Sequence, residues 1–243
     1  MTDAYPIEVL QDARISTRNG AYSEALDKYR WFYENALVYE RGLSGVRNSY
    51  VLNEWAQLGE VYPPARRELE SVRDEKTTLL REGSPEVGLF FDLSSINFAL
   101  GQVELTSALF AEIAERGREF AQKCFRAALP ALVETLDFSL ARRFVKPPQD
   151  SLGFLARILN IGIESCLSDA SDYSIMYPKS LISVYMKNVH LFLDVLVGVG
   201  EAEEAGRFAA AAVELVSHPV CRQEIRYRLR SYLAEDSNRG NSE

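Results

Sequence analysis

The sequence predicts an all-α protein, built from antiparallel helix pairs stacked into an α-solenoid of about 11–12 helices. Two observations lead to this fold class. Apolar residues recur at helical spacing along most of the 243 residues, and a short turn pattern repeats along the chain. Strand signals are nearly absent, since no alternating apolar run is bounded by Asn-Gly or Asp-Gly. The single Asn-Gly dipeptide, Asn19-Gly20, precedes a helix-period run and indicates an interhelix turn.

Glycine and proline mark the ends of the expected N-terminal helices. Gly20 should end the first helix in the left-handed conformation that such a stop favours. Pro63 and Pro64 should open the fourth helix, because proline suits the first helical turn, and Pro130 should kink the seventh. The pattern predicts helices over about 7–18, 22–39, 44–59, 63–80, 87–100, 104–113, 118–133 and 138–145.

Lys146-Pro147-Pro148 is the clearest internal linker, so we expect helical repeats over 1–146 and further helical repeats over 149–234 that continue the same stack. Helices are expected in this second part over about 152–167, 179–199, 202–217 and 219–234. The stretch 168–177 is rich in Ser and Asp and predicts an irregular loop. The polar tail 235–243 is expected to be disordered.

Composition excludes several functional classes. Apolar residues make up 47% of the chain and charged residues 26%, which is typical of a globular protein. The formal net charge of −8 repels nucleic acid and anionic lipid, so neither is an expected partner. The most apolar helix, 181–199, is interrupted by Lys187 and Asp194, and we expect a core helix there instead of a membrane span.

Three cysteines, an odd number with no CxxC, argue against a disulfide framework or a zinc knuckle. Buried thiols in a reducing compartment are the simpler interpretation. The N-terminus has neither a basic segment nor an apolar run typical of a secretory signal. We therefore expect a cytoplasmic protein.

The repeated pattern is a turn residue followed four or five positions later by a small residue. It occurs at Gly20 and Ala25, Gly101 and Thr106, Asp137 and Ala141, and Gly200 and Ala205. Two helices joined by a tight turn approach closely only where the crossing side chain is small, so these residues are expected at helix crossings.

The segment from Trp55 to Tyr62 carries W-x₂-L-G-x₂-Y, with Leu58 and Gly59 at the inner positions. Together with the turn that begins at Gly20, it resembles the tetratricopeptide repeat (TPR), and the chain is similar to uncharacterised bacterial proteins that begin with such repeats. The resemblance covers 3–143 and 197–215. The repeats here are longer than the family's, and prolines replace the glycine usual in the second turn.

The resemblance implies a concave groove lined by the first helix of each pair. On this alignment the groove residues are Arg14, Arg18, Asn53, Asp92, Ser95, Lys123 and Arg126. Trp31 is added as a candidate aromatic anchor, because Trp31 and Tyr33 flank the inward Phe32 and cannot both face the core. The Lys and Asn clamp that some relatives use for a terminal carboxylate is not reproduced as a set.

The expected function is therefore a non-enzymatic scaffold that binds a peptide or protein segment, with no cofactor and no metal. His190 and Asp194 share a helical face, but two ligands without a third do not make a metal site. A stripe of Arg222, Arg226 and Arg230 indicates the solvated face of a capping helix or an anion-binding surface.

Two alternative functions stay open. The chain could be an immunity-type or regulatory protein that binds one toxin or ligand through the region 168–177. It could also be an enzyme of unrecognised mechanism, although no G-x-S-x-G, P-loop or GxGxxG occurs. The partner and the oligomeric state are not determined by the sequence.

Overall fold

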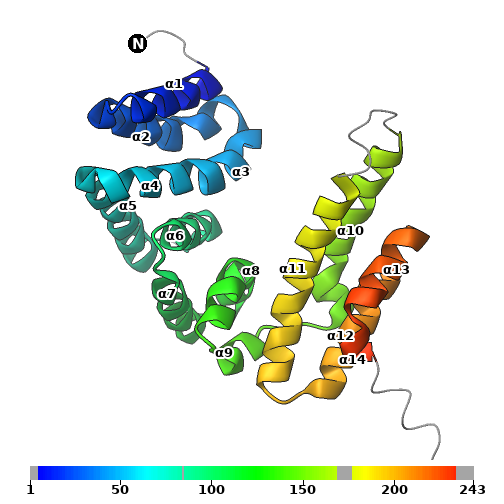
Figure 1. Ribbon diagram of the computed structural model, residues 1–243. Helices are drawn as coiled ribbons and strands as arrows, with labels where there is room; N and C mark the ends of the chain where they lie inside the picture. The colour runs from blue at the N-terminus through cyan, green and yellow to red at the C-terminus, as the bar shows by residue number, and fades with distance from the viewer. Residues whose placement is uncertain (1–4, 84, 169–176, 234–243) are drawn as a thin grey trace, which may run out of the picture. The chain divides into compact units, whose positions relative to one another are not determined.

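The computed structural model describes residues 5–83, 85–168 and 177–233, and this part of the chain is helical with no strand (Figure 1). The all-α prediction is confirmed. Most of the expected loop at 168–177, and the whole expected tail 235–243, lie outside the described residues. The chain divides into two compact units, 1–131 and 132–243. The expected repeat regions, 1–146 and 149–234, stay predictions.

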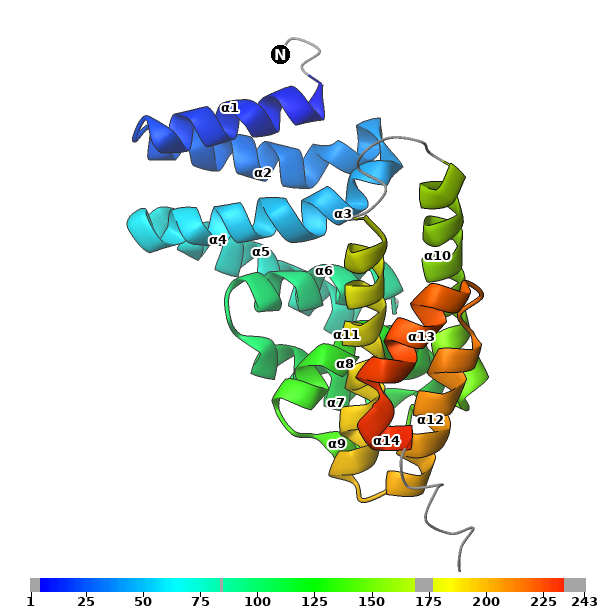
Figure 2. The same cartoon turned by 45° about the vertical axis from the view of Figure 1, so that its right-hand side comes forward.

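The N-terminal unit is formed by helices that pack against their neighbours in sequence. α1 packs on α2, α4 on α5 and α6 on α7, while α2 also contacts α4 and α4 contacts α6 (Figure 1 and Figure 2). The helices are α1 (Pro6–Arg18), α2 (Tyr22–Tyr39), α4 (Leu52–Val61), α5 (Pro63–Glu82), α6 (Val87–Ala99), α7 (Val103–Arg116) and α8 (Arg118–Glu134), the last running across the unit boundary.

The helix predicted over 44–59 is present as an unbroken helical run, but its first half contains a π turn that the sequence did not indicate. A 3-10 turn at Arg41–Leu43, the short α3 (Ser44–Val46) and a wider π turn at Arg47–Val51 precede α4. The side chain of Arg47 is buried, and its Nε donates to the carbonyl oxygen of Tyr33 at 2.7 Å. Such tertiary bonds outweigh the regular helical register, and a π turn accommodates the change.

The C-terminal unit is arranged around α11 (Tyr177–Gly198). This helix contacts α9 (Phe138–Arg142), α10 (Pro148–Ser168), α12 (Ala202–Glu214) and α13 (Pro219–Arg228). Within α11, Lys179–Gly198 is long and apolar enough to cross a membrane by length and composition, with 44% of the window buried. The core helix of a helical unit can have the same length and apolar composition.

The last predicted helix, 219–234, is divided in the structure. The chain turns at Leu229 between α13 and α14 (Arg230–Leu233). Leu229 is fully buried, and both short helices pack on α12. The turn lets two separate segments cover one helix, which a single straight helix would not do.

One turn geometry closes four of the described helices. Gly20, Gly101 and Gly200 have φ of 76°, 68° and 81°, which confirms the predicted left-handed stop at Gly20. The residue after each turn residue donates its N–H to the carbonyl five residues earlier, a bond typical of the Schellman motif. These bonds join Ala21 to Ser16, Gln102 to Asn97, Asp137 to Leu132 and Glu201 to Leu196, at 2.8–2.9 Å.

The fourth turn residue is Leu136, with φ of 59°, and not the expected Asp137. Ala141 then lies five residues after the turn residue, as in the other three cases. The small residues Ala25, Thr106, Ala141 and Ala205 are all buried. Asp137 instead caps α9, because its side chain accepts the N–H of Leu140 at 3.2 Å.

Leu136 offers a direct measure of the cost of this turn. Its side chain is 70% exposed, so truncation loses little packing. Since a left-handed conformation costs an L-residue about 1–2 kcal/mol, Leu136→Gly should raise the free energy of unfolding by about 1 kcal/mol in urea titrations. Gly200→Leu, at an open position of the same turn type, should lower it by a similar amount. A lower stability of Leu136→Gly would contradict this account.

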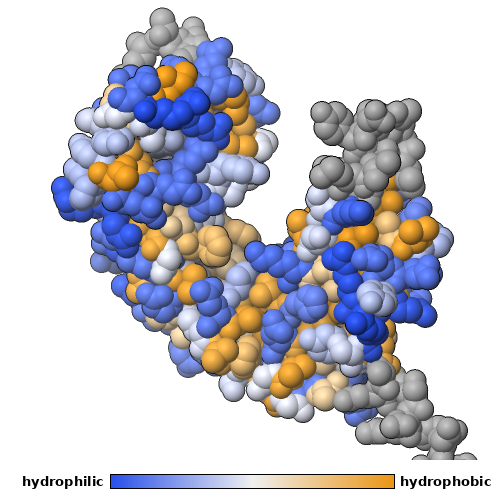
Figure 3. Space-filling view, viewed as in Figure 1, coloured by the Kyte–Doolittle hydropathy of each residue, from blue (hydrophilic) through white to orange (hydrophobic). Residues whose placement is uncertain are grey.

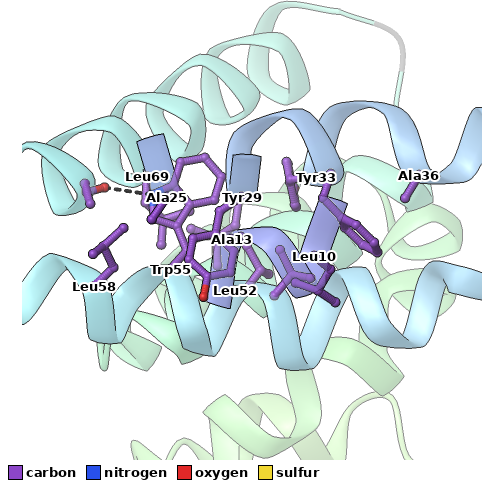
Figure 4. Packing of buried hydrophobic residues seen from close by; sticks show 14 of the residues in the cluster. Leu10, Ala13, Ala25, Tyr29, Tyr33, Ala36, Leu52, Trp55, Leu58 and Leu69 are labelled. Carbon is purple, nitrogen blue, oxygen red and sulfur yellow. Dashed lines mark hydrogen bonds between the residues drawn. The ribbon is translucent and has the colours of Figure 1, made fainter. Parts of the chain in front are cut away.

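Trp55 and Leu58 of the W-x₂-L-G-x₂-Y segment belong to the hydrophobic core of the N-terminal unit, and Tyr62 packs against it (Figure 4). Trp55 is fully buried, and its indole N–H donates to the carbonyl of Ala65 at 2.9 Å, which ties α4 to the first turn of α5. Gly59 faces α5 so closely that a Cβ there would lie 2.9 Å from the Cβ of Arg66. The ring of Tyr62 lies 6.0 Å from that of Tyr22.

Gly59→Ala should therefore separate α4 from α5. The added methyl would also lie 3.1 Å from the Arg66 backbone, and overpacking of this kind costs about 1–3 kcal/mol of unfolding free energy. Gly88→Ala, in the first turn of α6 with open space around its Cβ, is the matched control and should be neutral or stabilising. Equal effects of the two substitutions in thermal and urea unfolding would contradict the close approach.

Candidate functional site

An open groove of about 580 Å³ lies on the N-terminal unit between α1, α2 and α4. Its charged lining comes from Arg14 and Arg18 of α1 and from Glu54 of α4. Tyr22 of α2 and Val61 of α4 contribute apolar surface, and Val61 is 60% exposed. The tight turn between α1 and α2 brings Arg18 and Tyr22 into this one groove.

Arg14 and Glu54 form a two-point ion pair across the groove. Arg14 Nε donates to both carboxylate oxygens at 3.0 Å, and a second guanidinium nitrogen donates to Oε1 at 2.7 Å. The hydrogen bonds that Arg14 donates to the Glu54 carboxylate raise the pKa of Arg14. This fork geometry fixes the two side chains, so Arg14 shapes the groove and orients its neighbour.

Arg18 is differently placed. It is exposed, its Nε donates to the carbonyl of Arg14 at 3.3 Å, and it forms no ion pair within the described part of the chain. Tyr29 and Leu58, both almost fully buried, form the floor beneath it. Burial raises the pKa of Tyr29, so its hydroxyl stays protonated and can hydrogen-bond. The groove therefore combines one available cation with apolar surface.

Asp92, an expected groove residue, lies in a separate buried cluster. Its carboxylate accepts two bonds from Arg47, at 2.6 and 3.0 Å, and one from Lys76 at 2.8 Å. The guanidinium of Arg47 also lies 3.8 Å from the centre of the Tyr33 ring. Burial acts to raise the pKa of Asp92, but the hydrogen bonds and charges of Arg47 and Lys76 outweigh it and lower that pKa.

The other expected groove residues lie apart from the α1–α4 groove. Asn53 is exposed on α4, and Trp31 is half-buried at the edge of the core, with its ring 5.8 Å from that of Tyr39. Ser95 donates to the carbonyl of Phe91 within α6. Lys123 and Arg126 are both exposed on α8, where Lys123 pairs with Glu119 at 2.8 Å.

Sequence reasoning missed two sets of residues. On α4 the polar lining of the groove is Glu54 and Gln57, which lie one and four positions after the expected Asn53. The opposite charges of Arg14 and Glu54 were the available signal. Arg47 and Lys76 gave no signal, because nothing local to them indicates a partner 45 or 16 residues away.

The cysteines and His190 are the other candidates for chemistry, and the structure shows their surroundings. All three cysteines are buried and free, and burial raises the pKa of Cys124 to about 11. The described residues contain no group of three or more His, Cys, Asp or Glu side chains able to hold a metal ion. His190 lies near Tyr232, with the ring centres 6.4 Å apart.

The arginine stripe of the last helix is divided among different partners. Arg222 donates to the carbonyl of Val216 at 2.8 Å, and Arg226 pairs with Glu214 at 2.9 Å. Arg230 lies over the ring of Tyr227, 4.2 Å from its centre. A second open groove of about 390 Å³ includes Arg226 and Arg230, but its cations are already engaged.

Comparison of the chain with protein-family models, curated proteins and solved structures finds no match. The chemistry of the α1–α4 groove therefore follows from its own side chains. An exposed guanidinium beside tyrosine rings and valine can hold a carboxylate and an apolar side chain of a ligand together.

The Asp92 cluster makes stability dependent on pH. The carboxylate contributes stability that is fully present above the ordinary aspartate pKa of 3.8 and is lost as pH falls through its lower folded value. Asp92→Asn should cost about 3 kcal/mol of unfolding free energy at pH 7, because two cations lose their buried partner. The difference from the wild type should shrink in urea titrations below about pH 4.

Asp27→Asn is the control for this experiment. Asp27 is exposed on α2 and forms no ion pair among the described residues. Its stability difference from the wild type should be small at every pH. A large difference for Asp92→Asn that stays constant down to pH 3 would show that the carboxylate charge is not the cause.

Proposed function

We propose that this chain is a TPR-like, cytoplasmic protein-interaction scaffold in which the helix pairs stack as an α-solenoid and unit 1–131 binds a peptide or protein segment without catalysis. The repeated turn at Gly20, Gly101, Leu136 and Gly200 supports the stacking of similar hairpins. The W-x₂-L-G-x₂-Y residues support the family resemblance through their packing, since Trp55 and Leu58 are buried and Gly59 lies against α5.

The single observation that carries the binding proposal is Arg18 in the α1–α4 groove. It is an exposed cation without an ion pair in the described part of the chain, next to exposed Val61 and the Tyr22 ring. In a TPR-like stack the first helix of each pair lines the concave face. If α1 and α4 are such first helices, the α1–α4 groove lies on that face. A ligand carboxylate would gain a charge-assisted bond to Arg18, and an apolar neighbour would cover Val61.

The alternative of an immunity-type or regulatory protein depends on the region 168–177, which lies mainly outside the described residues. The alternative of an unrecognised enzyme would need a nucleophile or base in the groove. The described groove residues supply carboxylate, guanidinium, amide, hydroxyl and apolar groups, with Glu54 held by Arg14. This set suits binding better than bond cleavage.

Arg18→Glu should abolish capture of groove-dependent partners. The substitution places a carboxylate next to Glu54, so an anionic ligand group would meet repulsion in place of attraction, with a loss of at least about tenfold in affinity. The measurement is recovery of partners from lysate by the tagged full chain, quantified by mass spectrometry against the wild type.

Arg67→Glu is the matched control. Arg67 is exposed on α5, outside the groove, and has no ion pair among the described residues. This variant carries the same change in net charge and should recover the wild-type set of partners. Identical partner sets for the wild type, Arg18→Glu and Arg67→Glu would overturn the groove assignment.

A further inference from the structure

Helix α10 carries an apolar stripe on the side that faces away from its own core. Phe154, Ile158 and Ile161, at spacings of four and three, are 51%, 49% and 55% exposed. Leu159 and Ile163, on the opposite side of the helix, are almost fully buried. One buried side is enough to hold a helix in its unit, so a second apolar side points to an interface.

The apolar stripe continues onto α11. The two helices run antiparallel and side by side (Figure 1), and a Cβ at Gly162 would lie 2.6 Å from Leu181 Cδ1. Leu181 therefore marks the line along which α11 meets α10, and Val184, three residues further, lies on its solvent side with 62% of its surface exposed. Figure 3 shows orange apolar residues among blue polar ones over α11 on the face turned to the viewer. The α10–α11 face consists of Phe154, Ile158, Ile161 and Val184.

The area of the α10–α11 face is close to what a stable dimer needs. With about half of each side chain exposed, the four side chains together offer about 300–400 Å² of apolar surface. An interface of standard size buries about 800 Å² on each partner, and about 65% of a homodimer interface is apolar. The four side chains supply most of that apolar area, and the residues around them complete the interface.

The stripe on α10 is complementary to itself when two copies run antiparallel. If a two-fold axis passes midway between Ile158 and Ile161, each Ile158 lies opposite the Ile161 of the other copy. Phe154 then lies opposite Ser165, which is exposed on the same side of the helix, four residues after Ile161. The small serine leaves room for the phenylalanine ring, so large and small side chains alternate across the contact as close packing requires.

The absence of charge on the α10–α11 face also favours a second copy. None of its four residues is ionisable, and Ser165 is neutral. A two-fold axis brings each charge near it close to the same charge of the other copy, where the two repel. An uncharged, apolar centre suits an interface between identical chains and offers nothing for a charged partner to recognise.

We propose that the α10–α11 face binds the same face of a second copy of this chain, so that α10 and α11 of both copies form a two-fold symmetric four-helix bundle. The dimer is argued from residues of unit 132–243 and does not depend on the proposed function. If the α1–α4 groove binds as proposed, each dimer carries two grooves and would hold a partner with two binding segments more tightly than one copy does.

Sedimentation velocity of the full chain measures the association. The wild type should form a dimer with a micromolar dissociation constant, and the dimer should persist in about 1 M salt, because salt screens charges and leaves apolar contacts intact. Ile161→Glu should raise the dissociation constant at least about a hundredfold, since each dimer would bury two carboxylates without partners.

Val38→Glu is the matched control. Val38 is 83% exposed on α2, in the other unit, so this variant places the same charge on an exposed apolar position outside the face. It should keep the wild-type dissociation constant. Urea unfolding curves of both variants establish that the fold is retained.

Cysteine cross-linking tests the register with substitutions that add no charge. A mixture of Phe154→Cys chains and Ser165→Cys chains should form a disulfide-linked dimer in oxidised glutathione, because these positions lie opposite each other across the two-fold axis. Either variant alone should form much less. The three natural cysteines are buried, which keeps them out of the reaction.

Four outcomes would overturn the inference. A monomer at all concentrations up to about 100 μM would remove the dimer. Equal effects of Ile161→Glu and Val38→Glu, or equal cross-linking of the mixture and of each variant alone, would remove this face or this register. A monomeric wild type that binds lipid vesicles through Ile161 would show that a membrane covers the face. Loss of partners by Arg18→Glu in a monomeric wild type would leave the proposed function standing while this inference fails.

Discussion

Four pairs of consecutive helices in the described part of the chain, α1–α2, α6–α7, α8–α9 and α11–α12, are joined by the same hydrogen-bonded turn. The bond from the residue after the turn to a carbonyl five residues earlier sets where the next helix begins. In all four turns the residue five positions later is small and buried, which lets the next helix pack closely. At Leu136 the left-handed turn is formed although the residue is not glycine, so the turn is kept despite its conformational cost.

A second constraint is the charge buried at the start of the α4 segment. Removing Arg47 and Asp92 from water is costly, and only a complete set of partners offsets that cost. The two-point pair, the Lys76 bond, the Tyr33 carbonyl and the Tyr33 ring supply this set from α2, α5 and α6. The cluster therefore ties α6 to the earlier helices, and the local π turn is the distortion that lets Arg47 reach it.

The groove proposed as a binding surface on the N-terminal unit combines charge with apolar contact. It places the exposed cation of Arg18 beside the exposed apolar side chain of Val61. Cations of this kind are in the minority on an acidic chain, so they give selectivity through charge and affinity through apolar contact. Arg14 and Asp92 differ, because their charges are satisfied internally.

The sequence by itself determined the helical class, most helix limits and three of the four turn residues, with the left-handed conformation predicted at Gly20. These depend on local rules: apolar periodicity, the backbone freedom of glycine and the missing N–H of proline. It also placed Arg14 and Arg18 on one face of α1, because residues four apart share a helical face. Only the tertiary structure decided that Glu54 faces Arg14, that Asp92 is buried against Arg47 and that Leu136 adopts the turn. Each of these is settled by partners distant in sequence or by the packing of whole helices, and a local pattern carries no record of such contacts.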